Sequence, residues 1–177
     1  GNEAFLRSNE VSFNYKTIKV NSCKINSEII SSSLIKKYIQ NNKIEKANTL
    51  LGRKYSIEGK VVRGTGRGKK LDFPTANINP NNKDICIPSN GVYAIALKMN
   101  GNKYKGMCNI GHRPTFDDLN DSIIEINLFH KFKDDFYNCN VNVAFIKYIR
   151  EEKKFNSKID LITQLKLDKE KCMKIND

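Results

Sequence analysis

Residues 92–110 read VYAIALKMNGNKYKGMCNI, and this stretch predicts a β-hairpin. Alternate apolar side chains of the first run are expected on one face of a strand: Tyr93, Ile95, Leu97 and Met99. Asn100-Gly101 follows, and an Asn-Gly pair between two extended runs is typical of a type I′ turn, whose central residues need a positive φ. Residues 102–110 should therefore return antiparallel to the first run.

Other segments indicate that the hairpin belongs to a larger β structure. Further strands are expected over three ranges: 55–62, 123–129 and 141–150. Several short strands joined by turns indicate a small antiparallel barrel or sandwich. A helix should close the chain, because Ser157 followed by Asp160 resembles a capping box and Ile162 and Leu165 supply an apolar stripe.

The first fifty residues predict mixed αβ structure. A short strand is expected over 11–20, followed by a helix with Leu34 and Ile39 on its apolar face. A second amphipathic helix should span 44–51, with Gly52 at the position where glycine commonly ends a helix. Such short elements cannot bury a sizeable core alone, so they must pack on other parts of the protein.

Composition limits the class of protein. The 177 residues carry a net charge of +12, which allows a nucleic acid, a membrane surface or a phosphorylated small molecule as partner. The five cysteines include no CxxC pair and there are only two histidines, so no structural zinc site is expected, and reduced thiols in a cytoplasmic protein are predicted. No apolar run is long enough for a membrane span.

A glycine-rich basic segment stands at residues 64–77, which read GTGRGKKLDFPTAN. Its alternate glycines, beginning at Gly64, allow the backbone close to a ligand, and cations such as Lys70 would suit a polyphosphate. The spacing is not that of a P-loop. A flexible basic hairpin loop is the alternative interpretation.

Thr75 and Asn77 follow Pro74, which fixes the backbone where this segment ends. Two residues apart in extended structure, they place a hydroxyl and an amide oxygen on one face. Both are hard oxygen donors suited to Mg²⁺. A polar strand start with local hydrogen bonds is the alternative.

The segment VVRGTGRGKKLDFPTAN at 61–77 resembles the nucleotide-binding segment of the riboflavin kinase family. The resemblance covers about residues 55–172, and Asp72 departs from the glycine usual there. Further elements agree in order: Gly91-Val92-Tyr93-Ala94, Asn109-Ile110-Gly111, Pro114-Thr115-Phe116, Glu125, Asp135-Phe136-Tyr137 and Ile149-Arg150-x-Glu152-x-x-Phe155.

This resemblance implies a mainly β fold, a small antiparallel Greek-key barrel with a C-terminal helix. It also implies an enzyme that phosphorylates riboflavin to FMN with ATP and Mg²⁺, releasing ADP. Thr75 and Asn77 would bind the metal. The implied ATP-binding residues are Gly64, Lys70, Thr75, Asn77, Leu128, His130 and Tyr137.

Glu125 is the catalytic residue that the resemblance implies. By alternation its side chain lies opposite Ile124 and Ile126, which would otherwise suggest an ordinary solvated glutamate. A carboxylate there could take the proton of the 5′-hydroxyl of riboflavin. Arg150, Lys153 and Phe155 are expected on the flavin side, or else they form a plain basic loop with one anchoring aromatic.

Residues 30–36 and 50–53 resemble the end of the FMN adenylyltransferase domain of bifunctional FAD synthetases. We therefore expect a remnant of that domain over 1–52 and the kinase domain over 53–177. An HxGH nucleotide signature is absent, so FMN rather than FAD is the expected product, and the adenylyltransferase domain of a full-length protein would be a partner.

Two other functions stay open. Asp72 favours a degenerate kinase that binds flavin and nucleotide with weak turnover. The positive charge permits a nucleic-acid-binding barrel, although Tyr93, Tyr104 and Tyr148 are scattered over different strands and form no stacking face. Small molecules, rather than nucleic acid or a membrane, are the expected partners.

Overall fold

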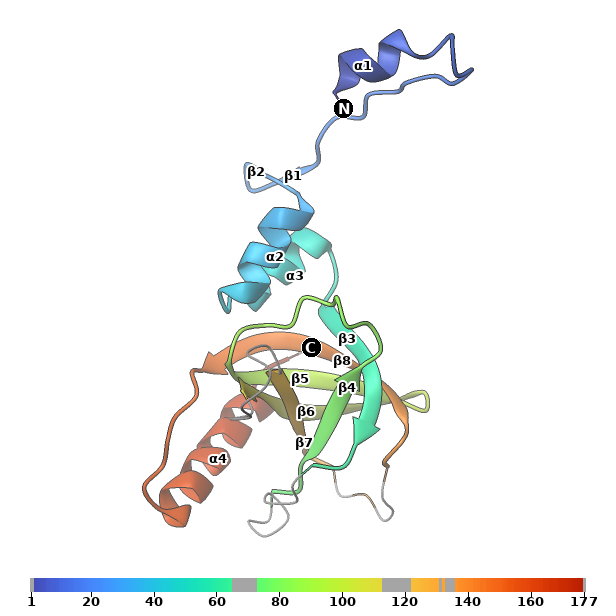
Figure 1. Cartoon of the computed structure of the whole chain (residues 1–177). Coiled ribbons are helices and arrows are strands. Elements are labelled where there is room, and N and C mark those ends of the chain that lie inside the picture. Colours follow the sequence, from blue (N-terminus) through green and yellow to red (C-terminus); the bar gives the residue numbers. More distant parts are fainter. Residues whose placement is uncertain (1, 65–72, 113–121, 131, 133–135, 177) are drawn as a thin grey trace. The chain divides into compact units, whose positions relative to one another are not determined.

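Six antiparallel strands close into a barrel (Figure 1). The structure is a computed structural model that describes residues 2–64, 73–112, 122–130, 132 and 136–176. The strands are β3 (Tyr55–Val62), β4 (Ala76–Pro80), β5 (Gly91–Met99), β6 (Asn102–His112), β7 (Ser122–Leu128) and β8 (Asn140–Arg150). Around the barrel their order is β3-β4-β7-β6-β5-β8.

The topology confirms the Greek-key prediction. Strands β5, β6 and β7 follow one another, and β8 returns to pair with β5, which gives the spatial order β8-β5-β6-β7 that defines a Greek key. The expected hairpin is also present. Met99 pairs with Asn102, and both Asn100 (φ 49°) and Gly101 (φ 78°) have the positive φ that a type I′ turn requires.

Apolar side chains fill the barrel. Tyr93 of β5 and Phe145 of β8 are fully buried, and their rings meet edge to face with centroids 5.5 Å apart. Ile57, Ile110 and Ile124 are also buried. A small closed barrel has room inside only for side chains, so ligand chemistry must take place on its outer face.

Helix α4 (Lys158–Met173) packs across β5, β6 and β8 on the outside of the barrel (Figure 1, orange-red). Its start is as predicted: the Ser157 hydroxyl accepts the Asp160 N–H at 3.1 Å. Under it lies a second apolar cluster of Phe73, Val92, Ala94, Met107 and Cys172. Strand β5 is consequently buried on both faces, whereas alternation in the sequence identified only one.

Helices α2 (Ser32–Gln40) and α3 (Ile44–Leu51) precede the barrel and belong to the same compact unit, residues 32–177. Gly52 ends α3 with the left-handed φ of 66° expected of it. Asn48 joins α3 to the barrel, because its Oδ1 accepts the Tyr55 N–H at 2.6 Å and its Nδ2 donates to the Phe145 carbonyl at 3.0 Å.

Residues 1–31 form a separate unit with α1 (Glu3–Ser8) and a two-residue ladder of β1 (Lys24–Ile25) and β2 (Glu28–Ile29). The strand predicted over 11–20 was wrong. Asn14 has a φ of 51°, and the Glu10 carboxylate accepts the Thr17 N–H at 2.8 Å. This side chain meets a backbone group that a strand partner would otherwise bind. No described side chain of this unit is buried.

In the described part of the chain, no helix has the length and apolar character needed to cross a membrane.

The burial of Cys172 gives a test of α4 docking. Burial, together with the nearby charge of Asp168, raises the pKa of Cys172 from 9.0 to about 12. At pH 8.5 roughly one such thiol in three thousand is ionised, so iodoacetamide should alkylate Cys172 far more slowly than the exposed Cys23. Mass spectrometry of the two peptides measures the ratio.

The same thiol gives a pH dependence. An unfolded chain loses the Cys172 proton at lower pH than the folded one, so this group lowers the free energy of unfolding as pH rises above about 9.

The alkylation test has a contradicting outcome. Alkylation of Cys172 at a rate close to that of Cys23 at pH 8.5 would show that α4 does not cover the barrel.

Candidate active site

The pairing of β4 with β7 brings three predicted residues together on the outer face of the barrel. Asn77 lies directly opposite Glu125 in the ladder. The Thr75 hydroxyl donates to Glu125 Oε1 at 2.6 Å. The alternate residues Ala76 and Ile126 are buried, so Thr75, Asn77 and Glu125 share the opposite side of the sheet, as alternation predicted for Glu125.

Glu125 has a polar neighbour on its other side too. Asn109 of β6 lies opposite it, so a row of Asn77, Glu125 and Asn109 crosses three adjacent strands. The charge of Glu125 also acts on Cys108, the residue before Asn109 in β6. Burial raises the pKa of the Cys108 thiol well above its usual range, and the Glu125 carboxylate adds to that rise. This thiol therefore stays protonated beside the carboxylate.

Asn127 holds the segment that carries Thr75. It is 6% exposed, and its Nδ2 donates to the Pro74 carbonyl at 2.8 Å. Pro74 has a fixed φ, so this hydrogen bond to its carbonyl fixes the position of the peptide bond that leads into Thr75. Asn127 and Glu125 are two residues apart in β7 and therefore lie on the same face, and both side chains contact the segment of Pro74 and Thr75.

A pocket of about 250 Å³ opens beside these groups. Five of its lining residues were predicted as site residues: Thr75, Glu125, Arg150, Lys153 and Phe155. Nine others were not: Phe73, Val92, Met107, Asn109, Asn127, Glu152, Leu161, Leu165 and Asp168. Asn109 and Asn127 could have been found as polar positions alternating with apolar ones. The α4 residues gave no signal, because their place depends on how the helix docks.

Arg150, at the end of β8, is tied to α4. Its Nε donates to both oxygens of Asp168 at 3.1 and 2.9 Å, and its Nη2 donates to Asp168 Oδ2 at 2.7 Å. The guanidinium also stands 5.9 Å from the centroid of the Phe155 ring. Two of the predicted flavin-side residues, Arg150 and Phe155, therefore lie together at an ion pair with a helix that the sequence did not connect to them.

Three of the residues predicted to bind ATP, Leu128, His130 and Tyr137, do not line this pocket. Leu128 is buried at the end of β7. His130 and Tyr137 belong to a chain of aromatic rings that includes Tyr104, Phe132 and Phe136, with neighbouring centroids 4.6–6.4 Å apart.

This aromatic chain reaches the root of the glycine-rich segment. The Arg63 guanidinium lies 5.1 Å from the centre of the Tyr137 ring. Gly64 lies against Asn77, since a Cβ on Gly64 would stand 3.1 Å from Asn77 Oδ1. Lys70 and Asp72 lie outside the described residues.

The arrangement can accept a hard divalent cation. Thr75 Oγ1, Asn77 Oδ1 and the Glu125 carboxylate are oxygen donors on one face, and Mg²⁺ commonly takes one or two protein oxygens and fills its shell with waters and substrate phosphates. Among the described residues no cluster of three or more His, Cys, Asp or Glu side chains could hold a metal. The donor set fits a metal that arrives with a nucleotide better than a permanently bound ion.

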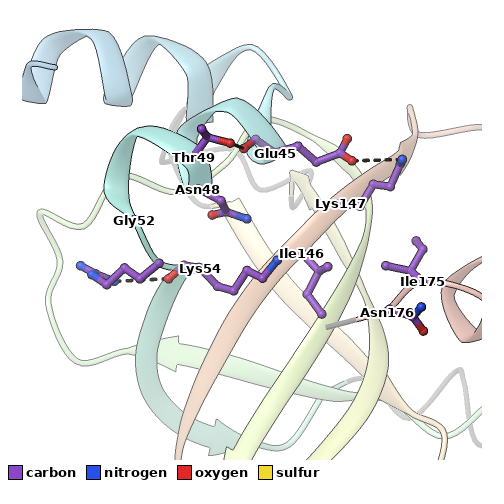
Figure 2. Close-up of a pocket in the computed structure, with 10 residues that line it drawn as sticks. Glu45, Asn48, Thr49, Gly52, Lys54, Ile146, Lys147, Ile175 and Asn176 are labelled. Carbon is purple, nitrogen blue, oxygen red and sulfur yellow. Dashed lines mark hydrogen bonds and ion pairs between the residues drawn. The ribbon is translucent and has the colours of Figure 1, made fainter. Parts of the chain in front are cut away.

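A larger pocket, of about 680 Å³, contains none of the predicted residues (Figure 2). It lies between α3, β8 and the last described residues. Glu45 and Lys147 on its rim pair with each other at 3.1 Å, and the amide of Asn48 bonds the backbone of Tyr55 and Phe145. Its size alone does not make it the active site, because none of the residues predicted for the chemistry lines it.

A family model matches most of the chain. The model described as "Flavokinase: Riboflavin kinase" matches residues 51–176. The chain belongs to the riboflavin kinase family. Its riboflavin kinase domain contains all of the site residues named above from Arg63 onward, and the matched range begins at the end of α3 and includes α4.

Curated relatives carry a second activity in their names. The chain is 42% identical over 147 residues to the bifunctional riboflavin kinase/FMN adenylyltransferase of Bacillus subtilis, covering 82% of this chain and 46% of that protein. The protein of the same name from Buchnera aphidicola (subspecies Schizaphis graminum) is 39% identical, with 95% and 54% covered. The chain thus spans about half the length of these relatives.

A solved structure shares the fold. The crystal structure described as a macrolide-efflux protein from Streptococcus pneumoniae aligns with a TM-score of 0.85 and 30% identity, covering 96% of this chain and 55% of that one. The shared fold extends over nearly all of this chain.

Asn127 offers a test of how the riboflavin kinase domain holds Thr75. Asn127→Ala leaves the Pro74 carbonyl without its donor, so the free energy of unfolding should fall by about 1–3 kcal/mol. Urea denaturation measures the change. The matched control is Asn142→Ala on β8, a less buried side chain whose amide makes longer contacts, 3.2 Å to Ser56 Oγ and 3.5 Å to Glu58 Oε1. An equal or smaller loss for Asn127→Ala would contradict its role.

Proposed function

We propose that this chain transfers the γ-phosphoryl group of Mg-ATP to the 5′-hydroxyl of riboflavin, giving FMN and ADP. The observation that carries the proposal is the position of Glu125 in the wall of the 250 Å³ pocket of the riboflavin kinase domain. Its carboxylate accepts a hydrogen bond from the Thr75 hydroxyl there. In phosphoryl transfer to an alcohol, a carboxylate beside the acceptor oxygen can orient the hydroxyl and take its proton.

Glu125 is the proposed catalytic residue. As the 5′-oxygen forms its bond to the γ-phosphorus, the bond from that phosphorus to the bridging oxygen breaks, and ADP leaves with the bonding electron pair. The proton of the 5′-hydroxyl passes to Glu125. Thr75 holds the carboxylate in one orientation through its 2.6 Å hydrogen bond, and such positioning contributes to the rate without further chemistry.

Thr75 and Asn77 are the proposed metal ligands. A bound Mg²⁺ would neutralise charge that develops on the phosphate oxygens. The protein's own contribution is to present two neutral oxygens from adjacent same-face positions, beside the root of the glycine-rich segment at Gly64. Neutral ligands leave the full charge of the metal available to the phosphates.

The nucleotide side of the site is assigned to Gly64, Lys70, Leu128, His130 and Tyr137. The aromatic chain that joins His130 to Tyr137 supports this part of the proposal, since an adenine ring stacks favourably on aromatic side chains. The Arg63–Tyr137 contact joins these rings to the strand that leads into the glycine-rich segment.

The flavin side is assigned to Arg150, Lys153 and Phe155, which line the pocket with Glu125. Phe155 offers an apolar ring face, and the cations can hold polar edges of the isoalloxazine or the phosphate of FMN. Apolar residues of α4 complete this wall.

We also propose that residues 1–52 are the last part of an FMN adenylyltransferase-like domain. The Buchnera relative aligns with 95% of the chain, beyond the range 51–176 of the kinase match. In residues 2–31 several large apolar side chains are exposed, including Phe5, Val11 and Phe13. Such surface is normally covered by a partner or another domain.

Glu125→Gln tests the catalytic assignment. The amide keeps the shape of the side chain and cannot accept the proton, so kcat should fall by roughly 10²–10⁴-fold. The KM for ATP should stay within a few-fold. Steady-state kinetics measure both. Glu58→Gln, at an exposed position of β3, is the matched control and should retain wild-type kcat.

The product decides between the proposed function and its alternative. Incubation of the chain with riboflavin and Mg-ATP, followed by chromatography, should give FMN and no FAD. Quenching of riboflavin fluorescence with Mg-ADP present, but without any FMN formed, would instead identify a flavin-binding relative without turnover. If the chain neither binds riboflavin nor forms FMN, the proposal is contradicted altogether.

A further inference from the structure

Asp168 is unusual for a charged residue. It is 0% exposed, and in the part of the chain that the structure describes it is the one buried side chain among Asp, Glu, Lys, Arg and His. It comes from the middle of α4, on the side that faces the pocket. A buried carboxylate is costly unless it is paired and fully hydrogen-bonded, so its partners indicate its purpose.

Both oxygens of Asp168 are fully engaged. Oδ2 accepts two N–H groups of Arg150, and Oδ1 accepts Arg150 Nε and Gln164 Nε2, the latter at 2.9 Å. Gln164 lies one turn earlier on α4 and fixes the carboxylate from its own helix. The carboxylate therefore has a single orientation, and it imposes that orientation on a planar guanidinium.

Arg150 still has donors for a ligand. Its Nη1 donates to the Glu151 carbonyl at 2.7 Å, and Nε and Nη2 donate to Asp168. Of the five N–H groups of a guanidinium, one on each terminal nitrogen stays unassigned by these contacts. The side chain is 12% exposed and borders the pocket, where Phe155 lies over the same guanidinium.

We propose that Asp168 is a positioning residue for the flavin substrate, acting through Arg150. It fixes the guanidinium plane, so that the two remaining N–H groups and the Phe155 ring present one preformed wall to an isoalloxazine ring. This inference rests on the proposed riboflavin kinase function. It adds a requirement to that function: α4 must be docked, with Asp168 paired to Arg150, for the flavin wall to exist.

Asp168→Asn tests the proposal in the whole chain. The amide keeps the size of the side chain, but its NH₂ group replaces one carboxylate oxygen and cannot accept a hydrogen bond from Arg150. The KM for riboflavin and its Kd from flavin fluorescence should rise roughly tenfold or more, the loss typical of a charged hydrogen-bonding partner. The kcat and the KM for ATP should change by no more than about threefold, because the group acts on flavin binding alone.

A merely structural role predicts a different result. It would lower the folded fraction, and hence the kcat per total protein, while the folded molecules kept their KM for riboflavin. Ser157→Ala is the matched control, because it removes the N-cap of the same helix without touching the ion pair. It should lower the Tm and leave the KM for riboflavin unchanged. An equal rise in KM for Ser157→Ala and Asp168→Asn would overturn the proposal.

Gln164→Met covers the case in which Asp168→Asn does not fold. It removes the Gln164 donor and leaves the ion pair, so the KM for riboflavin should rise by about two- to fivefold, as for loss of one hydrogen bond. An unchanged KM would overturn the proposal.

The wild-type protein separates this proposal from the proposed function. Wild-type protein that forms no FMN would contradict the proposed function, whereas the fluorescence Kd of Asp168→Asn would still decide the role of Asp168. Wild-type protein that binds no flavin would overturn both.

Discussion

Closure of the six-strand barrel is the constraint on which the rest of the structure depends. Tyr93, Phe145 and the aliphatic side chains around them fill its interior, so no ligand can enter it. Every polar group with chemistry to perform must then lie on the outer face. Alternation along each strand makes this possible, because the same strands that bury Ile124 and Ile126 inside carry Glu125 outside.

The ladder also fixes which outer groups meet. Glu125 has Asn77 on one side and Asn109 on the other only because β7 lies between β4 and β6 in an exact register. A shift of β7 by one residue would carry Glu125 to the barrel interior, away from both asparagines. The register of the strands therefore positions the side chains of this site. The 2.6 Å hydrogen bond from Thr75 to Glu125 is a result of that register.

Much of the fold follows from local sequence patterns. The strand predicted over 55–62 has the bounds of β3, and the Asn100-Gly101 turn and the Ser157 cap are as expected. The strand predicted over 11–20 was wrong because its backbone finds local acceptors instead of a partner strand. The N–H groups of Phe13, Tyr15 and Thr17 donate to Asn9 and Glu10. The second buried face of β5 was missed because it depends on α4, far away in the sequence.

The sequence by itself indicated the family and five of the six barrel strands, and it predicted roles for Thr75, Asn77 and Glu125, because these depend on residue type and spacing over a few positions. Only the tertiary structure decided that Arg150 is held by Asp168, that Asn127 holds Pro74, and that α4 forms a wall of the pocket. These are contacts between separate elements. Their geometry comes from packing α4 on a closed barrel, which no local pattern specifies.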